Sequence, residues 1–316
     1  MSAPAETLAP AYEVVCDTAD EAVWLEHRNT GIGASEIAIL LGESDWGSNL
    51  ELYYRKTGQL TEPLKEQTEE MELGKEFEEI ARRVVAKRAG VTLHPICPQL
   101  CRSLVHPWAL ATCDAVTSTR DPVEVKNLNW GFDAEEWSEQ IPEKYLLQCQ
   151  QQMMVLGAER CLFGALLSGS RLIWEWVPRD EQRIRRILHA GAEFWNHVEA
   201  RTPPPSDGHP HARKVLGRLA ANANEAALEL YESEISEQLR TYEIAKARHE
   251  SAAAQEKIDR RRLDASKDEL AQLLGDFRLG VTSTGWSMRW KTTERRGYTV
   301  QPTTVHQFEI KPPKEK

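Results

Sequence analysis

The chain has 316 residues, of which 41% are hydrophobic and 28% charged, and its formal net charge is −10. Its apolar runs, such as Ile37 to Leu41, are far too short to cross a bilayer, and its first ten residues lack the basic and apolar stretches of a signal peptide. These features argue against a membrane protein and, with six scattered cysteines typical of reduced thiols, predict a cytoplasmic location.

The acidity is concentrated near the start of the chain. Residues 1–80 carry 18 acidic and 5 basic side chains, whereas the remaining residues carry 31 acidic and 34 basic ones. Nucleic-acid binding needs only a local basic track, and local carboxylates can hold a divalent metal. The net charge therefore neither supports nor excludes a DNA substrate.

Before Gly90 the sequence predicts helices. The segment Thr18-Ala19-Asp20-Glu21 is typical of a capping box, and it starts a helix that contains Trp24 and Arg28. The chain then turns at residues 31–35 into a second helix that ends near Gly42. We expect a third helix from about residue 49 to 57 and a longer one over residues 68–89, each followed by a glycine.

After Gly90 the pattern changes to short β-compatible segments at residues 91–97, 99–105, 110–117 and 122–128. A helix is expected over residues 143–156, a strand hairpin over 161–167 and 172–177, and a closing helix over 181–199. Helices before and after a mostly consecutive sheet indicate one α/β (α+β) domain over residues 12–200.

The composition changes again beyond this domain. Residues 201–212 are rich in proline and predict a linker. Residues 213–276 are rich in Ala, Glu, Leu, Arg and Gln, which favours a helical hairpin or short coiled coil. Residues 277–316 favour a small β element and a tail.

A candidate catalytic site consists of Asp114 and the segment Glu124-Val125-Lys126. Strand alternation places Glu124 and Lys126 on one side and Val125 on the other, and a hairpin of this length can bring Asp114 beside Glu124. Two carboxylates are suitable ligands for Mg²⁺, and the lysine adds positive charge where an attacking water loses a proton. Taken alone, this loose pattern also fits an exposed salt bridge between Glu124 and Lys126.

Five segments that follow one another within residues 20–200 form a more specific pattern. They are Trp24-Leu-Glu-His-Arg28 with Ile32-Gly-Ala-Ser35-Glu36, Gly74-Lys-Glu-Phe-Glu78, Thr112-Cys-Asp114, Val123-Glu-Val-Lys126 and Tyr145-Leu-Leu-Gln148-Cys-Gln150. This series resembles the viral recombinase (YqaJ) and lambda exonuclease family of the PD-(D/E)XK nuclease superfamily. The Pro-Asp-Gly surroundings common in the family are replaced by Cys-Asp-Ala around Asp114.

The resemblance implies a PD-(D/E)XK core with a metal site. Mg²⁺, with Mn²⁺ as a substitute, would be bound by the carboxylates of Asp114 and Glu124 and by the backbone carbonyl of Val125. Lys126 would activate the nucleophile, and Glu78 would assist from its helix.

The resemblance also implies a catalytic role for Gln148 and a contact of Arg28 and Ser35 with the 5′-terminal phosphate. An arginine fork and a hydroxyl at a helix start are suitable phosphate donors. Ser35 fits an ordinary N-cap as well, and Gln148 also fits a polar helix face shared with Gln151 and Gln152.

The implied activity is a Mg²⁺-dependent 5′→3′ exonuclease that acts on ends of linear double-stranded DNA and leaves 3′ overhangs for recombination, in a bacterial or phage-infected cytoplasm. The family further implies a trimer and a single-strand annealing recombinase as partner. Two alternatives stay open, a structure-specific or site-specific endonuclease of the same superfamily and a non-catalytic DNA-binding or scaffold protein.

Overall fold

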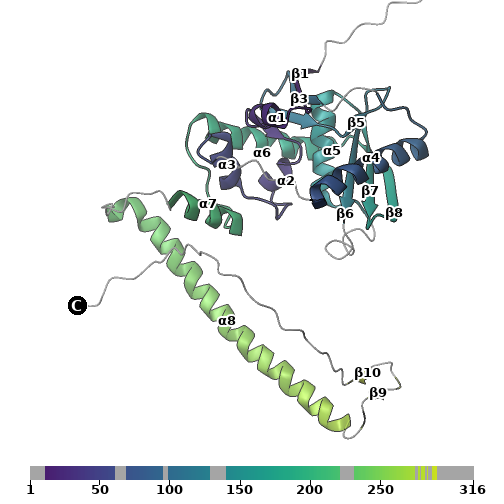
Figure 1. Cartoon of the computed structure of the whole chain (residues 1–316). Helices are drawn as coiled ribbons and strands as arrows, with labels where there is room; N and C mark the ends of the chain where they lie inside the picture. The colour runs from purple at the N-terminus through teal and green to yellow at the C-terminus, as the bar shows by residue number, and fades with distance from the viewer. Residues whose placement is uncertain are drawn as a thin grey trace, which may run out of the picture. The chain divides into compact units, whose positions relative to one another are not determined.

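The computed structural model describes residues 11–60, 69–94, 99–128, 140–220 and 231–274, together with residues 277, 279–281, 283 and 287–289. The chain divides into two compact units, one formed by residues 1–222 and 306–316 and the other by residues 223–305 (Figure 1). Each unit is described separately.

The first unit contains helices and strands in a mixed order. In chain order they are β1 (Tyr12–Asp17), α1 (Glu21–Arg28), β2 (Ile32–Gly33), α2 (Ile37–Leu40), α3 (Asn49–Lys56), α4 (Glu69–Ala89), β3 (Gln99–Ser103), β4 (Ala109–Thr112), β5 (Ala115–Val116), β6 (Pro122–Leu128), α5 (Glu143–Leu156), β7 (Arg160–Leu167), β8 (Arg171–Pro178), α6 (Glu181–Glu199) and α7 (Pro210–Ala220). The predicted α/β (α+β) class is therefore confirmed.

The strands form two four-stranded sheets rather than the single consecutive sheet that the sequence suggested. The first has the order β1-β3-β4-β2 and the second the order β5-β6-β7-β8. The chain passes from one sheet to the other at Cys113 and Asp114, between β4 and β5. The expectation of helices alone before Gly90 was also wrong, because β1 pairs antiparallel with β3 and Ile32–Gly33 pairs parallel with β4.

Local sequence explains the start of α1 and the end of α5. Asp20 caps α1, since its Oδ1 accepts hydrogen bonds from the backbone N–H groups of Ala22 and Val23. The capping box expected from Thr18 is thus replaced by an aspartate cap two residues later. Gly157 ends α5 with a φ of 73°, a left-handed conformation that favours glycine.

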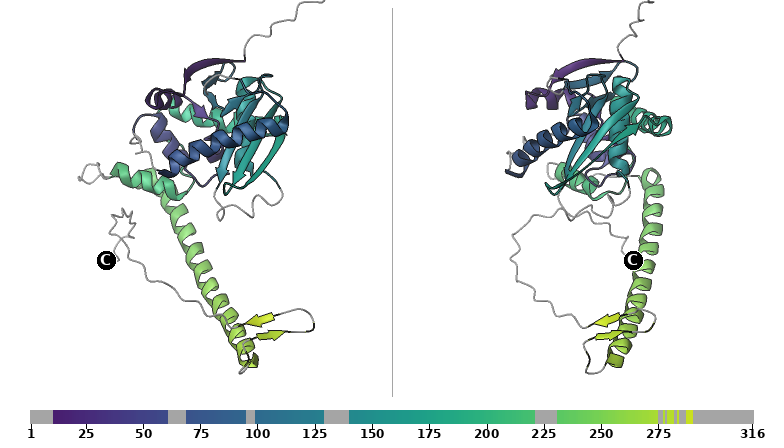
Figure 2. Two further views of the ribbon diagram at one scale, coloured as in Figure 1. Left: turned by 45° about the vertical axis from the view of Figure 1, so that its right-hand side comes forward. Right: turned by 90° about the vertical axis from the view of Figure 1, so that its right-hand side faces the viewer.

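Helix α4 covers one face of the second sheet (Figure 2). Its Ala81 and Val85 pack with Val123 and Val125 of β6. Strand alternation therefore directs Glu124, which lies between these two valines, toward the opposite face of the sheet. Helix α5 packs on that opposite face.

Helix α5 also packs on the first sheet. Its Leu147 and Val155 belong to a core with residues of β3 and β4, while its Cys149 and Met153 pack with Phe163 of β7. The long connection through α5 allows β6 and β7 to pair in parallel. This helix is therefore in contact with both sheets and can carry side chains into the region between them.

Part of the segment predicted as a linker is held on α3. The Asn49 side chain donates to the Pro205 carbonyl at 2.7 Å, the Asn49 backbone N–H donates to Asp207 at 3.0 Å, and His211 lies 3.0 Å from Glu51. Helix α7 begins at Pro210, inside the predicted linker of residues 201–212. Proline suits the first turn of a helix, where its missing N–H costs no hydrogen bond.

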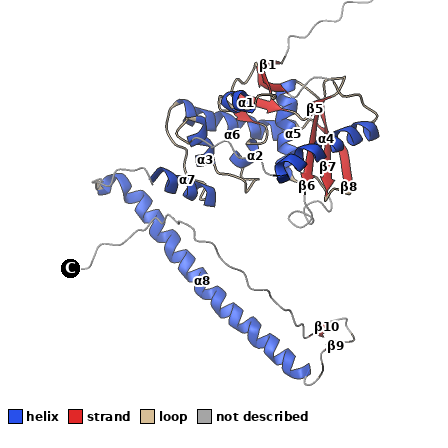
Figure 3. Cartoon of the chain, in the orientation of Figure 1, coloured by secondary structure: helices blue, strands red, loops and turns tan. Residues whose placement is uncertain are grey.

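The second unit contains α8 (Glu232–Leu274), β9 (Leu279–Val281) and β10 (Ser287–Arg289) (Figure 3). Within residues 213–276, where a helical hairpin or short coiled coil was expected, residues 232–274 form one uninterrupted helix of 43 residues. Residues 232–274 contain no glycine or proline that would end a helix. Strands β9 and β10 pair antiparallel within the predicted β element, while residues 290–316 of that segment lie outside the described residues.

Across the described residues, none of the helices combines the length and apolar character that a bilayer crossing requires.

Candidate active site

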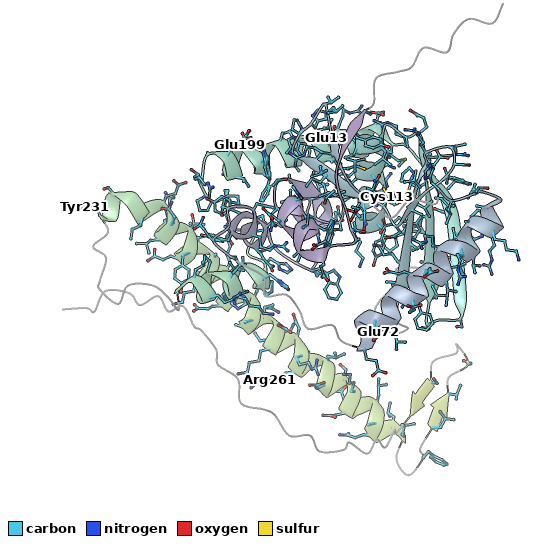
Figure 4. The ribbon with its side chains drawn as sticks, turned by 45° about the horizontal axis from the view of Figure 1, so that its top comes forward. Glu13, Glu72, Cys113, Glu199, Tyr231 and Arg261 are labelled. Carbon is cyan, nitrogen blue, oxygen red and sulfur yellow. The ribbon has the colours of Figure 1, made fainter. Side chains whose placement is uncertain are left out.

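Asp114 is held against the edge of β6. Its backbone N–H donates to the Val123 carbonyl at 3.1 Å, and its carboxylate atom Oδ2 accepts a hydrogen bond from the Val125 N–H at 2.7 Å. The preceding residue, Cys113, is buried within the first unit and is labelled in Figure 4. The sequence prediction that a short connection brings Asp114 to this strand is therefore confirmed.

Glu124 lies on the opposite face of β6 from Val123 and Val125, as strand alternation predicted. Only 1% of Glu124 is exposed. Its Oε1 accepts hydrogen bonds from the Lys126 ammonium group and from Gln148 Nε2, the latter at 2.7 Å. Its ion pair with Lys126 is therefore part of a buried network, and the alternative of an exposed salt bridge is wrong.

A second glutamine of α5 completes the surroundings of Glu124. Gln152 Nε2 donates to Glu124 Oε2 at 2.6 Å and to the Thr112 carbonyl at 3.1 Å. Residues 148 and 152 are four apart and thus share one face of the helix. That face is buried rather than solvated, which the sequence pattern did not reveal.

The group of Asp114, Glu124 and Lys126 is here called the acidic centre. Burial raises the pKa of Asp114 well above its usual value, and the charge of Glu124 raises it further, while Lys126 opposes both effects. Burial alone would lower the pKa of Lys126, but the charges of Glu124 and Asp114 outweigh it and raise that pKa. The raised pKa of Asp114 therefore reflects two buried carboxyl groups that lie beside a single lysine.

A cavity of about 510 Å³ opens beside Asp114. Its lining includes Asp114 of the acidic centre, Val125 of β6, Trp24 of α1, and Glu78 and Arg82 of α4. The sequence-predicted Glu78 is therefore placed beside Asp114, and its charge adds to the rise in the Asp114 pKa. The carboxylates of Asp114 and Glu78 therefore face space that could hold a ligand.

Arg82 is a cavity residue that the sequence analysis missed. It follows Glu78 by one helical turn, and its Nη1 donates to the Asp114 carbonyl at 2.8 Å. Among the described residues that line the cavity, Arg82 is the one basic side chain. Glu79 lines the cavity too, so the lining alone does not distinguish it from Glu78.

The donor groups at the cavity fit a magnesium ion. A strand residue directs its N–H and C=O toward the same edge, so the Val125 carbonyl faces the side on which its N–H meets Asp114. Within the described residues there is no group of three or more His, Cys, Asp or Glu side chains arranged to enclose a metal. Mg²⁺ is commonly bound through one or two carboxylates and keeps several waters.

A second charged group surrounds Glu36, which is 3% exposed. Its carboxylate lies 3.3 Å from Arg28 Nη2, 3.7 Å from Arg55 Nη2 and 2.7 Å from Lys56 Nζ. We call Arg28, Arg55 and Lys56 the cation cluster. Arg28 Nη2 also donates to Ser35 Oγ at 3.2 Å, so the two residues predicted to bind phosphate are in contact.

The contacts between Glu36 and the cation cluster shift the pKa values of Glu36 and Lys56. Burial would raise the pKa of Glu36, but Lys56, Arg28 and Arg55 outweigh it and lower that pKa to about 2. Burial lowers the pKa of Lys56, and the other two cations add to this effect while Glu36 opposes it. Three cations therefore lie against the carboxylate of Glu36.

Ser35 does not cap α2. The N-cap position belongs to Glu36, and its side chain makes no capping hydrogen bond. The N-cap alternative for Ser35 is therefore wrong, and its hydroxyl is directed to Arg28 instead. Arg55 and Lys56 were missed, because nothing in the sequence relates the end of α3 to the turn before α2.

Trp24 lies between the acidic centre and the cation cluster. The Arg28 guanidinium carbon is 5.1 Å from the centroid of the Trp24 ring, and Trp24 Nε1 donates to Thr112 Oγ1 at 3.2 Å. The ring is half-buried and lines the cavity rather than the core. Trp24 thus contacts Arg28 of the cation cluster and lines the same cavity as Asp114.

Fold and site together define the class of protein. Asp114 beside a strand that carries Glu124 and Lys126, with Glu78 on a preceding helix, is the arrangement of the PD-(D/E)XK nuclease superfamily. Residues 23–159 match the YqaJ-like viral recombinase domain family. The YqaJ protein of Bacillus subtilis (strain 168) is 31% identical over 244 residues, which cover 72% of this chain and 70% of that protein. The chain belongs to the YqaJ-like viral recombinase family.

Two solved structures are similar at lower identity. An alkaline exonuclease from Laribacter hongkongensis shares 17% identity with a TM-score of 0.47, and the match covers 65% of this chain and 100% of that one. A phage-related exonuclease from Haemophilus somnus 129PT shares 14% identity with a TM-score of 0.40, over 56% of this chain and 99% of that one.

Proposed function

We propose that this protein is a Mg²⁺-dependent exonuclease that degrades the 5′-ended strand of linear double-stranded DNA and leaves 3′ overhangs. The observation that carries this proposal is the pairing of two unlike charged groups through Trp24. The acidic centre suits a metal and a scissile phosphodiester, and the cation cluster suits a second phosphate. A DNA end with a 5′-phosphate offers phosphates to both groups.

The residues of the acidic centre have distinct roles in this proposal. Asp114, Glu124 and the Val125 carbonyl would hold the metal, and Glu78 would act beside it. When bound, Mg²⁺ supplies Lewis-acid stabilisation of the phosphate and lowers the pKa of water. Lys126 would place positive charge at the attacking water.

Two further residues would help to set the reacting groups in place. Gln148 would orient Glu124 through the hydrogen bond at 2.7 Å. Arg82 would present its remaining guanidinium donors to the scissile phosphate, because one donor is already fixed on the Asp114 carbonyl.

The cation cluster gives the proposed end preference. Arg28 and Ser35, supported by Arg55 and Lys56, would bind the 5′-terminal phosphate. A charge-assisted hydrogen bond to an ion is stronger than one between neutral groups. An internal position of a closed circle lacks this terminal phosphate, so the cluster favours ends.

Digestion of labelled duplexes tests this proposal. Linear duplexes that differ only in a 5′-phosphate or 5′-hydroxyl, each labelled on one strand, are incubated with Mg²⁺, with Mn²⁺ or with a chelator. We expect nucleotide release from the 5′-ended strand, faster on phosphorylated ends and lost with the chelator. Asp114→Asn serves as the inactive control.

Closed circular DNA separates the alternatives. Cutting of a closed circle as fast as a linear duplex would replace the exonuclease with an endonuclease of the same superfamily. Lack of metal-dependent cleavage on every DNA form would leave a DNA-binding or scaffold protein.

Assembly, partner and location complete the proposal. We propose a homotrimer that encircles the duplex, with a single-strand annealing recombinase that coats the exposed 3′ strand, in a bacterial or phage-infected cytoplasm. A closed ring requires a head-to-tail interface repeated around a three-fold axis. Light scattering measures the trimer, and a monomer that digests DNA processively contradicts it.

A further inference from the structure

Helix α5 carries four buried glutamines, and two of them donate to Glu124. Gln148 donates to Glu124, and Gln152 donates to Glu124 and Thr112. Gln150 donates to the Pro178 carbonyl and accepts from the Asp180 N–H, both at 2.8 Å. Gln151 donates to two carbonyls near the first sheet. Because buried amides need hydrogen-bond partners, each of these side chains is committed to one place.

Gln152 joins the two segments that carry the acidic centre. One amide donor contacts Thr112, two residues before Asp114, and also lies within hydrogen-bond distance of Glu124 on β6. Strands β4 and β6 belong to different sheets, and Asp114 between them already contacts β6 through Val123 and Val125. Gln152 adds a side-chain contact from the end of β4 to Glu124. The acceptor atom Oε1 is also occupied, by the Cys161 thiol at 3.8 Å.

The contact of Gln152 with Glu124 occupies part of the hydrogen-bonding capacity of that carboxylate. An ionised carboxylate offers about four acceptor positions on its two oxygens. Lys126 and Gln148 contact Oε1, and Gln152 contacts Oε2. These contacts fix the plane of the carboxylate and limit the directions left for a cation.

We propose that Gln152 is a positioning residue that holds Glu124 and the Asp114 segment at the separation a divalent cation needs. This inference rests on the proposed metal-dependent function. Gln152 supports the ligands without being one, and such supporting hydrogen bonds often change metal affinity by about 10–100-fold when they are lost. Gln148 alone cannot replace it, because Gln148 contacts only the Oε1 side of Glu124.

The test compares Gln152→Met with Gln150→Met in the full-length protein. Methionine keeps the length of the side chain and removes its hydrogen bonds. Gln150 is the matched control, because it is 1% exposed on the same helix and its amide contacts Pro178 and Asp180, away from Glu124. Ca²⁺ affinity is measured by calorimetry without DNA, and the Mg²⁺ concentration for half-maximal cleavage is measured separately.

We expect Gln152→Met to weaken Ca²⁺ binding about 10–100-fold and to raise the half-maximal Mg²⁺ concentration, with high Mg²⁺ restoring cleavage. Gln150→Met should lower thermal stability and leave both metal constants unchanged. If Gln152→Met does not fold, Gln152→Asn, whose amide is one methylene shorter, is measured in the same way and should also bind Ca²⁺ more weakly.

The possible results separate this inference from the function on which it rests. Wild-type Ca²⁺ affinity in a folded Gln152 variant overturns the positioning role, as does an equal loss in Gln150→Met. A wild-type protein that neither binds Ca²⁺ nor cleaves DNA overturns the proposed function first.

Discussion

Replacing Glu36 with glutamine removes the carboxylate that Arg28, Arg55 and Lys56 share. The pKa of Glu36 falls from 4.5 to about 2 in the folded protein. At about 1.4 kcal/mol for each pH unit, the charged form of Glu36 contributes about 3 kcal/mol to the free energy of unfolding near neutral pH. Glutamine resembles the protonated carboxyl, so Glu36→Gln is expected to lose about this amount.

Thermal unfolding measures this loss. For a domain of this size, about 3 kcal/mol corresponds to a fall of roughly 6–12 °C in Tm. Glu43→Gln is the matched control, because Glu43 lies 3.2 Å from Arg186 in a solvent-exposed ion pair. Such surface pairs contribute only about 0–1 kcal/mol.

The pH dependence provides a second measurement of the same contribution. Because the folded pKa lies below the unfolded value, the contribution is complete above about pH 4.5 and is lost as the pH falls toward 2. The Tm difference between wild type and Glu36→Gln should therefore be constant from pH 7 to 5 and shrink below that range. An equal Tm at pH 7, or a difference that stays the same at low pH, would refute the reasoning.

The same variant tests the cation cluster as an anion site. Without Glu36, three buried or half-buried cations lose the carboxylate they contact. Inorganic phosphate should therefore raise the Tm of Glu36→Gln more than that of the wild type. An equal phosphate effect on both proteins contradicts an anion site at this cluster.

Further variants test the acidic centre and the cavity. Lys126→Ala and Glu124→Gln should each abolish cleavage, lowering kcat by at least about two orders of magnitude, while gel shifts in Ca²⁺ still show DNA binding; near wild-type cleavage would remove that residue from the mechanism. Arg28→Ala should reduce the preference for 5′-phosphorylated over 5′-hydroxyl ends by about 10–100-fold, as expected for a contact of about 1.5–3 kcal/mol. Equal digestion of both ends by the wild type contradicts that role. Arg82→Ala should reduce kcat by about 10-fold or more, whereas Arg83→Ala, an exposed residue of the same helix, should not; equal kcat values for these two variants exclude Arg82 from the site.

The placement of the acidic centre was predictable because it depends on local geometry. Successive residues of a strand face opposite sides, so Glu124 and Lys126 had to share a face that Val125 does not. The short connection from Asp114 to β6 left few other positions for its carboxylate. The two-residue period of a strand carries such information without reference to the rest of the fold.

The cation cluster and the glutamine contacts were not predictable in the same way. Arg55 and Lys56 reach Glu36 only because α3 packs beside the turn before α2. Gln152 follows Gln148 by one helical turn, which the sequence shows, but a polar helix face is ordinarily solvated. Only the packing of α5 on both sheets turns that face inward.

The cation cluster and the acidic centre explain how a chain with a negative net charge could bind a polyanion. A net charge of −10 would repel DNA if it were spread evenly. In the cation cluster, however, three cations contact the carboxylate of Glu36, and in the acidic centre two carboxyl groups lie beside one lysine. An anion would suit the first group and a cation the second. A phosphorylated DNA end with its divalent cation supplies both charges, whereas an uncharged ligand supplies neither. The charge that matters for recognition is thus the local charge on either side of Trp24, and the net charge of the chain does not determine it.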